Sequence, residues 1–291
     1  MKMTAVAQLS AAGVTAVVIA LIGALATVCV GVLNYRTQRQ GLKRQQEQRA
    51  DQLNQARQQI ELFRAAQITQ RFTSAVEQLG SDKADVRIGG IYALEGIAGA
   101  SEYRRQITEV IAAFIQGHAP WPPIEPVRSG QPPEDRDYVR FPPLRSWAPD
   151  VQTAITVLAR REDAPTDEVI NLTRVDLRGA ELPYARLSGT LLRSSSLMRA
   201  ILHDADLREV DFAKTILEYA DLRNADLRGA ILANAKLAMA DLGGAQLANA
   251  KLEGADLSTI IHGGTDFRGA TSDKATRWPE GFDRERLKSL P

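Results

Sequence analysis

Residues 220–229 read Ala-Asp-Leu-Arg-Asn-Ala-Asp-Leu-Arg-Gly, and this five-residue unit recurs from residue 170 to residue 269. Steps of five residues from Leu222 give twenty registers, of which seventeen hold Leu, two hold Phe and one holds His262. The residue two before each centre is small in eighteen registers, being Ala in twelve and Thr, Ser or Val in six, and it is Ile in the other two. A period of five therefore organises about a third of the chain.

This period fits neither regular element. Five residues turn an α-helix by about 140°, so the Leu stripe would scatter around it, and in a strand the stripe would change face at every repeat. A chain that turns a corner every five residues keeps the central Leu and the small residue inside. We therefore expect a solenoid, with a Leu- and Ala-rich helical bundle as the disfavoured alternative.

The stretch resembles the pentapeptide-repeat family through its A-(D/N)-L-x-x unit, as at Ala205-Asp206-Leu207, Ala220-Asp221-Leu222 and Ala225-Asp226-Leu227. The resemblance implies a right-handed quadrilateral β-helix with four repeats per coil. Twenty repeats then make about five coils, roughly 24 Å long at the ~4.8 Å spacing of paired strands. The expected structural core includes Leu172, Leu177, Leu207, Phe212, Leu222, Leu227, Leu242, Leu257 and Phe267.

The position two after each centre carries corner residues. Seven registers have Gly there and three have Asn, the residue types that most readily adopt left-handed backbone conformations.

Composition removes several classes of function. The 291 residues include 36 basic and 35 acidic side chains, so the net charge of the chain gives no electrostatic attraction to nucleic acid. Cys29 is the only cysteine, which rules out an intrachain disulfide and a cysteine cluster for metal.

Residues 11–33 carry no charge and are long enough to span a bilayer. Lys2 precedes them, and Arg36, Arg39 and Lys43 follow, which favours a single-pass cell-membrane anchor, within residues 1–33, with the C-terminal domains in the cytoplasm. A signal peptide cleaved after the small-x-small triplet at residues 24–26 is one alternative, and a lipid anchor at Cys29 is another.

Residues 34–70 are Gln-rich and predict a cytoplasmic stalk helix. Leu53, Ala56, Ile60 and Phe63 follow heptad spacing, interrupted by polar residues. Self-association is therefore expected through this stalk or through the C-terminal cap. Basic residues near the start of the stalk also suit anionic lipid headgroups.

Residues 71–118 predict a helical module. Gly80 ends the preceding helix, Ser81 caps a second with Val86, Ile88, Ile91, Leu94 and Ile97 inward, and Ser101 opens a third that ends at His118. The runs at residues 75–80 and 86–95 resemble the HEAT- or armadillo-like segment that precedes the repeats in membrane-linked members of the family. Gly89 and Gly90 inside the second helix are read as allowing close packing.

Residues 119–149 hold nine prolines and predict a semi-rigid linker, parts of which dock through Trp121, Tyr138, Phe141 and Trp147. Residues 150–169 predict a short helix that covers the first coil. Residues 270–291 are expected to form a C-terminal cap, whose run from Arg277 to Asp283 resembles the terminal caps of related proteins.

No catalytic, cofactor or metal site is expected. The glycines of residues 170–269 follow the period of five and do not open a helix, and His118, His203 and His262 are far apart in sequence. Asp residues before the centres suggest Ca²⁺ ligands. Most precede Arg by two residues, so we expect exposed ion-pair ladders between coils instead. His262 is expected to be buried in the last coil and hydrogen-bonded if it points inward.

Apolar residues stand at outward positions where the repeat is usually polar. They are Leu191, Ile201, Ile216, Ile231 and Ile261, and four repeats per coil place Leu191 with Ile231 and Ile201 with Ile261. These side chains form a candidate partner-binding surface, although scattered exposed apolar residues are also ordinary.

The sequence therefore favours a non-enzymatic, membrane-tethered scaffold that presents a rigid rod to a protein partner. The alternative is a DNA mimic that binds a type II topoisomerase, as the family resemblance implies for some members. Residues 170–270 hold 13 acidic and 12 basic residues, which disfavours mimicry of a polyanion. An accessory role for an enzyme or transporter is the third hypothesis.

Overall fold

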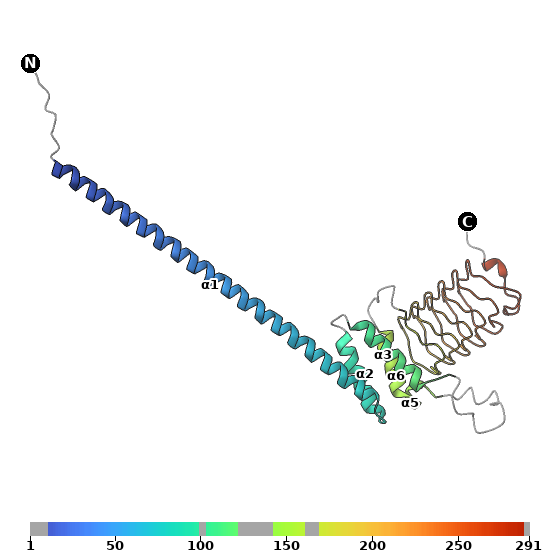
Figure 1. Cartoon of the computed structure of the whole chain (residues 1–291). Helices are drawn as coiled ribbons and strands as arrows, with labels where there is room; N and C mark the ends of the chain where they lie inside the picture. The colour runs from blue at the N-terminus through green and yellow to red at the C-terminus, as the bar shows by residue number, and fades with distance from the viewer. Residues whose placement is uncertain (1–10, 99–102, 122–141, 161–168, 288–291) are drawn as a thin grey trace, which may run out of the picture. The chain divides into compact units, whose positions relative to one another are not determined.

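The computed structural model describes residues 11–98, 103–121, 142–160 and 169–287 (Figure 1). It divides into two compact units, residues 1–67 and 68–291. Ser101, Tyr138 and Phe141, which are predicted to start a helix or to dock the linker, lie outside the described residues.

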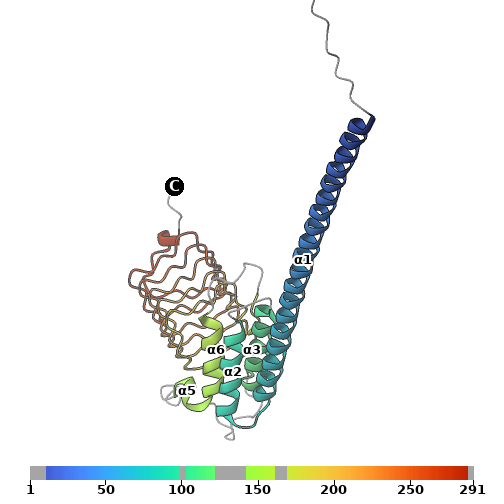
Figure 2. The ribbon, with the colours of Figure 1, turned by 90° about the vertical axis from the view of Figure 1, so that its left-hand side faces the viewer.

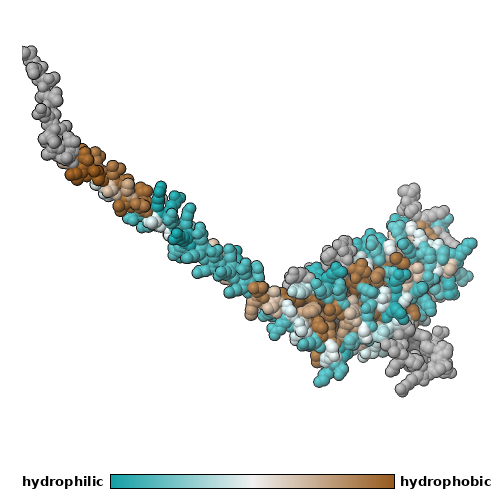
Figure 3. Space-filling model, in the orientation of Figure 1, coloured by the Kyte–Doolittle hydropathy of each residue, from teal (hydrophilic) through white to brown (hydrophobic). Residues whose placement is uncertain are grey.

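The first unit contains most of helix α1 (Ala11–Leu79). Every residue from 16 to 33 is exposed, and this stretch is the one candidate membrane span among the described residues. Figure 3 shows it as an apolar band, followed along α1 by a polar stretch. The expected stalk and the apolar segment are thus parts of one continuous helix.

The second unit begins with the last turns of α1 and continues with α2 (Ala84–Ala98), α3 (Arg104–His118), α5 (Leu144–Trp147) and α6 (Pro149–Ala159). Helix α6 packs against both α2 and α3 (Figure 2). Ile91, Leu94 and Ile97 are buried as expected, but Val86 is exposed. It lies five residues before Ile91, which turns it about 140° away from the buried face.

Gly90 confirms the expectation of close packing. A Cβ there would lie 2.8 Å from the carbonyl oxygen of Ala75 on α1. A Cβ at Gly89 would lie 3.7 Å from the side chain of Gln78, which is an ordinary van der Waals distance. One of the two glycines is therefore required by the approach of α2 to the end of α1.

Residues 170–271 form stacked coils in which each residue preceding a centre pairs with the residue twenty positions later, as in Asp221 with Asp241 (Figure 2). Leu222 N–H donates to the carbonyl of Asp241 at 2.8 Å, and Asp241 N–H donates to that of Ala220 at 2.9 Å. Four repeats thus make one coil. Pairing is confined to single-residue parallel bridges, and the described rod contains no continuous strand, because a corner follows every bridge.

The corners use left-handed backbone more widely than glycine and asparagine predict. Nine corner residues that are neither glycine nor asparagine have positive φ, including Arg174 and Tyr184 at 60°. The stacked hydrogen bonds of adjacent coils impose this conformation at a cost of roughly 1–2 kcal/mol for each such residue.

The core of the rod follows the prediction. All nine expected core side chains, from Leu172 to Phe267, are buried, and so are the alanines two positions before the centres. This core is continuous with that of the helices: Ile115, Ile155 and Ile170 belong to the same cluster. Ala119, Leu144 and Ala148, in the described ends of the expected linker at 119–149, belong to this cluster as well.

The C-terminal residues close the last coil. Trp278 and Phe282 stack at a centroid distance of 4.2 Å, and both meet the ring of Phe267 edge-on. The 3₁₀ helix η1 (Arg284–Leu287) follows, and Leu287 accepts a hydrogen bond from Gly269 N–H at 2.8 Å.

Candidate functional site

The β-bridges between coils do not bring the five apolar residues of the candidate partner surface together into one patch. Leu191 and Ile231 lie on one side of the rod with Asp211 between them. Ile201 and Ile261 lie on another side, separated by Asp221 and Asp241.

Ile216 lies on a third side, between Ser196 and Lys236. Ile261 is 55% exposed, and the other four candidate residues are half-buried. Alternation with polar residues along each side keeps the apolar side chains apart.

The structure does bring Ile201 to a groove of about 1060 Å³ beside the first two coils. The groove lies between α6 and the corner at Tyr184, and it combines exposed aromatic and basic side chains. Its lining includes Tyr92, Arg145, Arg160, Tyr184, Arg186 and His203.

Ring contacts and ion pairs order one wall of this groove. Tyr184 meets His203 edge-on with centroids 5.5 Å apart, and His203 Nδ1 lies 2.8 Å from Asp204 Oδ2. Arg145 pairs with Glu181 at 2.9 Å. The side chains of Arg160 and Arg186 have no ion-pair or hydrogen-bond partner among the described residues. One edge of the groove is therefore positively charged.

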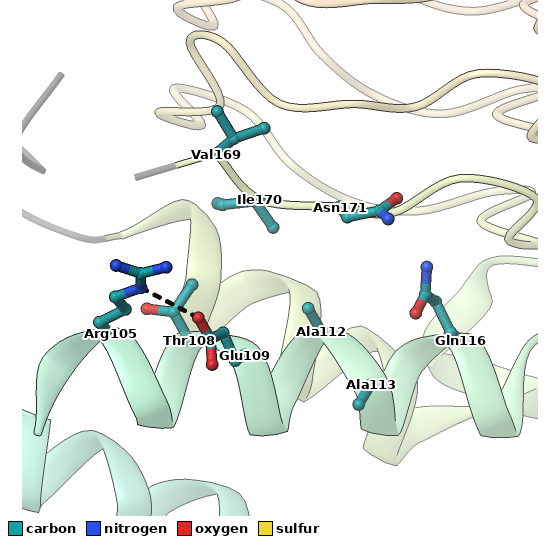
Figure 4. A pocket seen from close by; sticks show the side chains of 9 residues that line it. All are labelled: Arg105, Thr108, Glu109, Ala112, Ala113, Gln116, Val169, Ile170 and Asn171. Atoms are coloured by element: carbon teal, nitrogen blue, oxygen red, sulfur yellow. Dashed lines mark hydrogen bonds and ion pairs between the residues drawn. The ribbon is translucent and has the colours of Figure 1, made fainter. Parts of the chain in front are cut away.

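A second pocket, of about 360 Å³, lies between α3 and the start of the first coil (Figure 4). Ala112 and Ile170 provide apolar walls, and Gln116 and Asn171 provide polar ones. Arg105 and Glu109 form an ion pair at its rim with a separation of 3.0 Å.

This pocket marks an open side of the first coil. On the other three sides, backbone N–H groups of the first coil donate to the preceding helices and loop: Asp176 to the carbonyl of Ala119, Glu181 to Gln152 Oε1, and Arg186 to the carbonyl of Ala159. On the fourth side, Asn171 N–H has no acceptor within the described parts of the chain. The pocket therefore exposes the one uncapped edge.

The Asp-x-Arg units form forks inside a repeat, in addition to the expected ion pairs between coils. Asp221 accepts from Arg223 Nε at 2.8 Å and from Arg223 Nη2 at 2.6 Å. The contact of Arg223 to Asp241 on the next coil is longer, at 3.9 Å. The shorter in-repeat bonds arise because both side chains leave the same side of one corner.

These forks hold the carboxylates ionised. The hydrogen bond from the Arg223 side chain lowers the pKa of Asp221, and the equivalent bonds from Arg208, Arg228 and Arg268 lower the pKa of Asp206, Asp226 and Asp266. The carboxylates are thus occupied by guanidinium groups. The described residues contain no cluster of His, Cys, Asp and Glu suited to a metal.

The three histidines are separate. His118 Nδ1 lies 2.9 Å from the carbonyl oxygen of Phe114, at the end of α3. His262 occupies its core column but is only half-buried, and it meets Phe282 edge-on at 5.7 Å. The expected burial of His262 is therefore incomplete, because the last coil has only the C-terminal residues above it.

No sequence pattern indicated the groove residues that the helical segments contribute. Tyr92, Arg145 and Arg160 belong to separate segments with no motif in common. Ile201, an apolar residue at an outward position of the repeat, was the groove residue that the sequence indicated.

A family profile described as pentapeptide repeats matches eight copies in this chain, over residues 170–208, 205–242 and 232–261. The chain belongs to the pentapeptide-repeat family. No curated protein matches its sequence.

Solved pentapeptide-repeat proteins overlap with this member in part. Rfr23 from the cyanobacterium Cyanothece 51142 is 40% identical over 35% of this chain and 65% of its own, with a TM-score of 0.22. The protein alr5209 from Nostoc Pcc 7120 is 32% identical over 42% and 84% of the two chains, with a TM-score of 0.32.

HetL, which is involved in heterocyst differentiation regulation in Nostoc sp. strain PCC 7120, is 34% identical over 34% and 46% of the two chains, with a TM-score of 0.22. This pentapeptide-repeat protein thus spans less than two thirds of Rfr23 and of HetL. The family membership rests on the repeat profile.

Proposed function

We propose that this pentapeptide-repeat protein is a non-enzymatic scaffold, tethered to the cell membrane by one helix, that presents its rod and helical module to a protein partner. The exposed apolar segment of α1 supports the tether. All residues from 16 to 33 face outward, including Ile19, Leu21 and Leu25. A contiguous apolar surface of this length is unfavourable in water and suits a bilayer core of about 30 Å.

The proposed orientation places the C-terminal domains in the cytoplasm, since Arg36, Arg39, Lys43 and Arg44 follow the span. Protease treatment of sealed, inside-out membrane vesicles tests it. Digestion of residues 68–291 there, together with protection in right-side-out vesicles, is expected. The reverse pattern would contradict the orientation.

Membrane extraction tests the tether itself. We expect the full chain to stay in the membrane pellet after an alkaline carbonate wash, and Leu21→Arg to weaken this retention. Leu62→Arg, a matched change of an exposed residue outside the apolar segment, is expected to have no effect. An intact mass that lacks the first 26 residues would establish a cleaved signal peptide and refute the tether.

The groove beside Ile201 is the proposed partner site. Apolar and aromatic side chains next to Arg160 and Arg186 suit a protein segment that carries apolar and acidic residues. The HEAT-like character proposed for residues 71–118 is compatible with this use, because Tyr92 of α2 contributes to the groove.

A matched pair of variants tests the site in native membranes. Ile201→Glu is expected to reduce cross-linking to the partner at least tenfold, whereas Ile231→Glu, at an equally half-buried bridge position on another side, leaves it unchanged. Equal cross-linking in both variants would move the partner site away from the groove.

A DNA mimic remains the alternative function, and the charge of the rod counts against it. Its 13 acidic side chains are offset by 12 basic ones, and five of the acids are held in forks with Arg. A supercoiling assay with a type II topoisomerase and the detergent-solubilised chain distinguishes the two. We expect no inhibition, and dose-dependent inhibition would favour mimicry.

A further inference from the structure

Helix α1 carries an exposed apolar stripe between its membrane-length segment and residue 67. The stripe follows alternating steps of three and four residues through Leu53, Ala56, Ile60 and Phe63. Leu42 lies eleven residues before Leu53, on the same face of the helix. Leu53 and Phe63 are 62% and 70% exposed. These five residues are called the stalk stripe below.

The stalk stripe is distinct from the face of α1 that packs in the second unit. The next heptad positions after Phe63 are polar, at Gln67 and Gln70. The packed face begins at Ile68 and continues with Phe72, Ala75 and Leu79. The step of five residues from Phe63 to Ile68 turns the helix by about 140°, so the two faces differ. The stalk stripe therefore needs another explanation.

We propose that the stalk stripe is the seam of a parallel, in-register, two-stranded coiled coil formed with a second copy of this chain. From Leu42 to Phe63 the seam spans three heptads, about 33 Å of helix. Gln46 and Arg49 fall within the seam. Polar residues at such positions weaken a coiled coil but fix its register, and they remain solvated more easily in two strands than in larger bundles.

The residues that flank the seam select the parallel orientation. Within the seam, the position after three of the four inner residues of one set is basic, at Lys43, Arg57 and Arg64, and Ala50 follows Arg49. The opposite flank carries Gln45, Gln52 and Gln59. A parallel dimer places each basic flank beside the glutamine flank of the partner, whose amide oxygens accept hydrogen bonds from the cations. An antiparallel dimer would place the basic flanks together, and like charges would repel.

The proposed membrane tether strengthens this dimer. Three heptads with two polar layers give modest affinity, and anchoring both chains in one bilayer raises their effective concentration. The affinity of the dimer thus rests on the proposed function, because the tether raises it. The parallel orientation does not depend on the tether.

Site-directed disulfide formation tests the seam on the full chain in native membranes. In a Cys29→Ser background, A56C places a thiol on the seam, and Q58C places one on the outer face of the same turn. We expect oxidation to yield at least tenfold more disulfide-linked dimer with A56C than with Q58C. Equal yields at the two positions, or no dimer at either, would overturn the proposal.

A second pair of variants measures the mass of the detergent-solubilised chain by light scattering. The wild type and Leu62→Glu are expected at twice the chain mass of 31.8 kDa, and Ile60→Glu at one chain mass. Leu62 is as exposed as the stalk stripe but lies off the seam, so it controls for the added charge. A trimer, or a dimer that survives Ile60→Glu, would refute the seam.

The same samples separate this inference from the proposed tether. A chain that stays in the carbonate-washed pellet but yields no A56C dimer in native membranes would refute the dimer alone. A chain recovered in the soluble fraction would refute the tether alone, because A56C and Q58C still report on the dimer in solution.

Discussion

Arg87 on α2 and Asp150 on α6 form a largely buried ion pair, with Nε and Oδ2 separated by 2.7 Å and side-chain exposures of 16% and 5%. Arg87 also donates to the carbonyl of Ser81 at 2.8 Å. The pair therefore fixes the helix that caps the first coil to the turn before α2.

Removal of one partner should be severe. Asp150→Leu leaves the Arg87 guanidinium buried without a counter-charge, and we expect a loss of about 3–5 kcal/mol in the free energy of unfolding, measured by urea denaturation. The double variant Arg87→Met with Asp150→Leu should recover most of it. Glu109→Gln, which breaks the exposed pair with Arg105, is the control and should cost no more than about 0.5 kcal/mol.

The side chain of Gln152 makes the two hydrogen bonds to the Glu181 backbone that a preceding coil would otherwise make. Its Oε1 accepts from Glu181 N–H at 3.0 Å, and its Nε2 donates to the Glu181 carbonyl at 2.9 Å. We expect Gln152→Leu to cost about 1–3 kcal/mol and to speed hydrogen exchange at the Glu181 amide. The matched change Gln116→Leu on α3 should leave that amide unaffected, and equal protection in both variants would contradict the capping role.

Gly179 and Gly189 have nearly the same left-handed φ, 67° and 69°, but different surroundings. A Cβ at Gly179 would lie 2.9 Å from the carbonyl oxygen of Pro142 and 3.1 Å from Pro143 Cα, whereas one at Gly189 meets nothing within 4 Å. Gly189→Ala should therefore cost about 1–2 kcal/mol for backbone strain alone.

Gly179→Ala should cost about 2 kcal/mol more, because the backbone of residues 142–143 must shift. The shift also threatens the 2.9 Å hydrogen bond from Leu144 N–H to the Gly179 carbonyl. Equal urea midpoints for the two variants would show that this approach is not tight in solution.

The Asp-x-Arg forks predict acid sensitivity of the rod. Hydrogen bonds from Arg lower the folded-state pKa of Asp206, Asp221, Asp226 and Asp266 below the ordinary value of 3.8. A lowered folded-state pKa means that the forks contribute stability above pH 3.8 and lose it as the pH falls through the folded-state values.

We expect the urea midpoint of the rod to fall as the pH is lowered from about 4 to about 2, and Asp226→Asn to reduce this fall. Each fork is exposed to solvent, which screens the ion pair, so its share of this fall should be small. Glu47→Gln, which removes a carboxyl group from the first unit, is the control. A midpoint that does not change over this range would contradict the contribution of the forks.

Local, repeated signals made the rod predictable. The centre at Leu222 and the small residue at Ala220 recur every five residues, so each coil repeats the same inward and outward choices. Even there, the period did not show that a guanidinium such as that of Arg223 would fold back on Asp221 in its own repeat. That choice depends on side-chain directions at the corner.

The sequence by itself determined the five-residue solenoid, its Leu core and the apolar length of α1, because each depends on spacing between neighbours along the chain. Tertiary structure alone decided how the first coil is closed, through Gln152, Ala159 and Ala119, and which residues, Ile201 and Tyr92 among them, line one groove. These contacts join segments far apart in sequence and obey no period, so they exist only once the helices have packed on the coil.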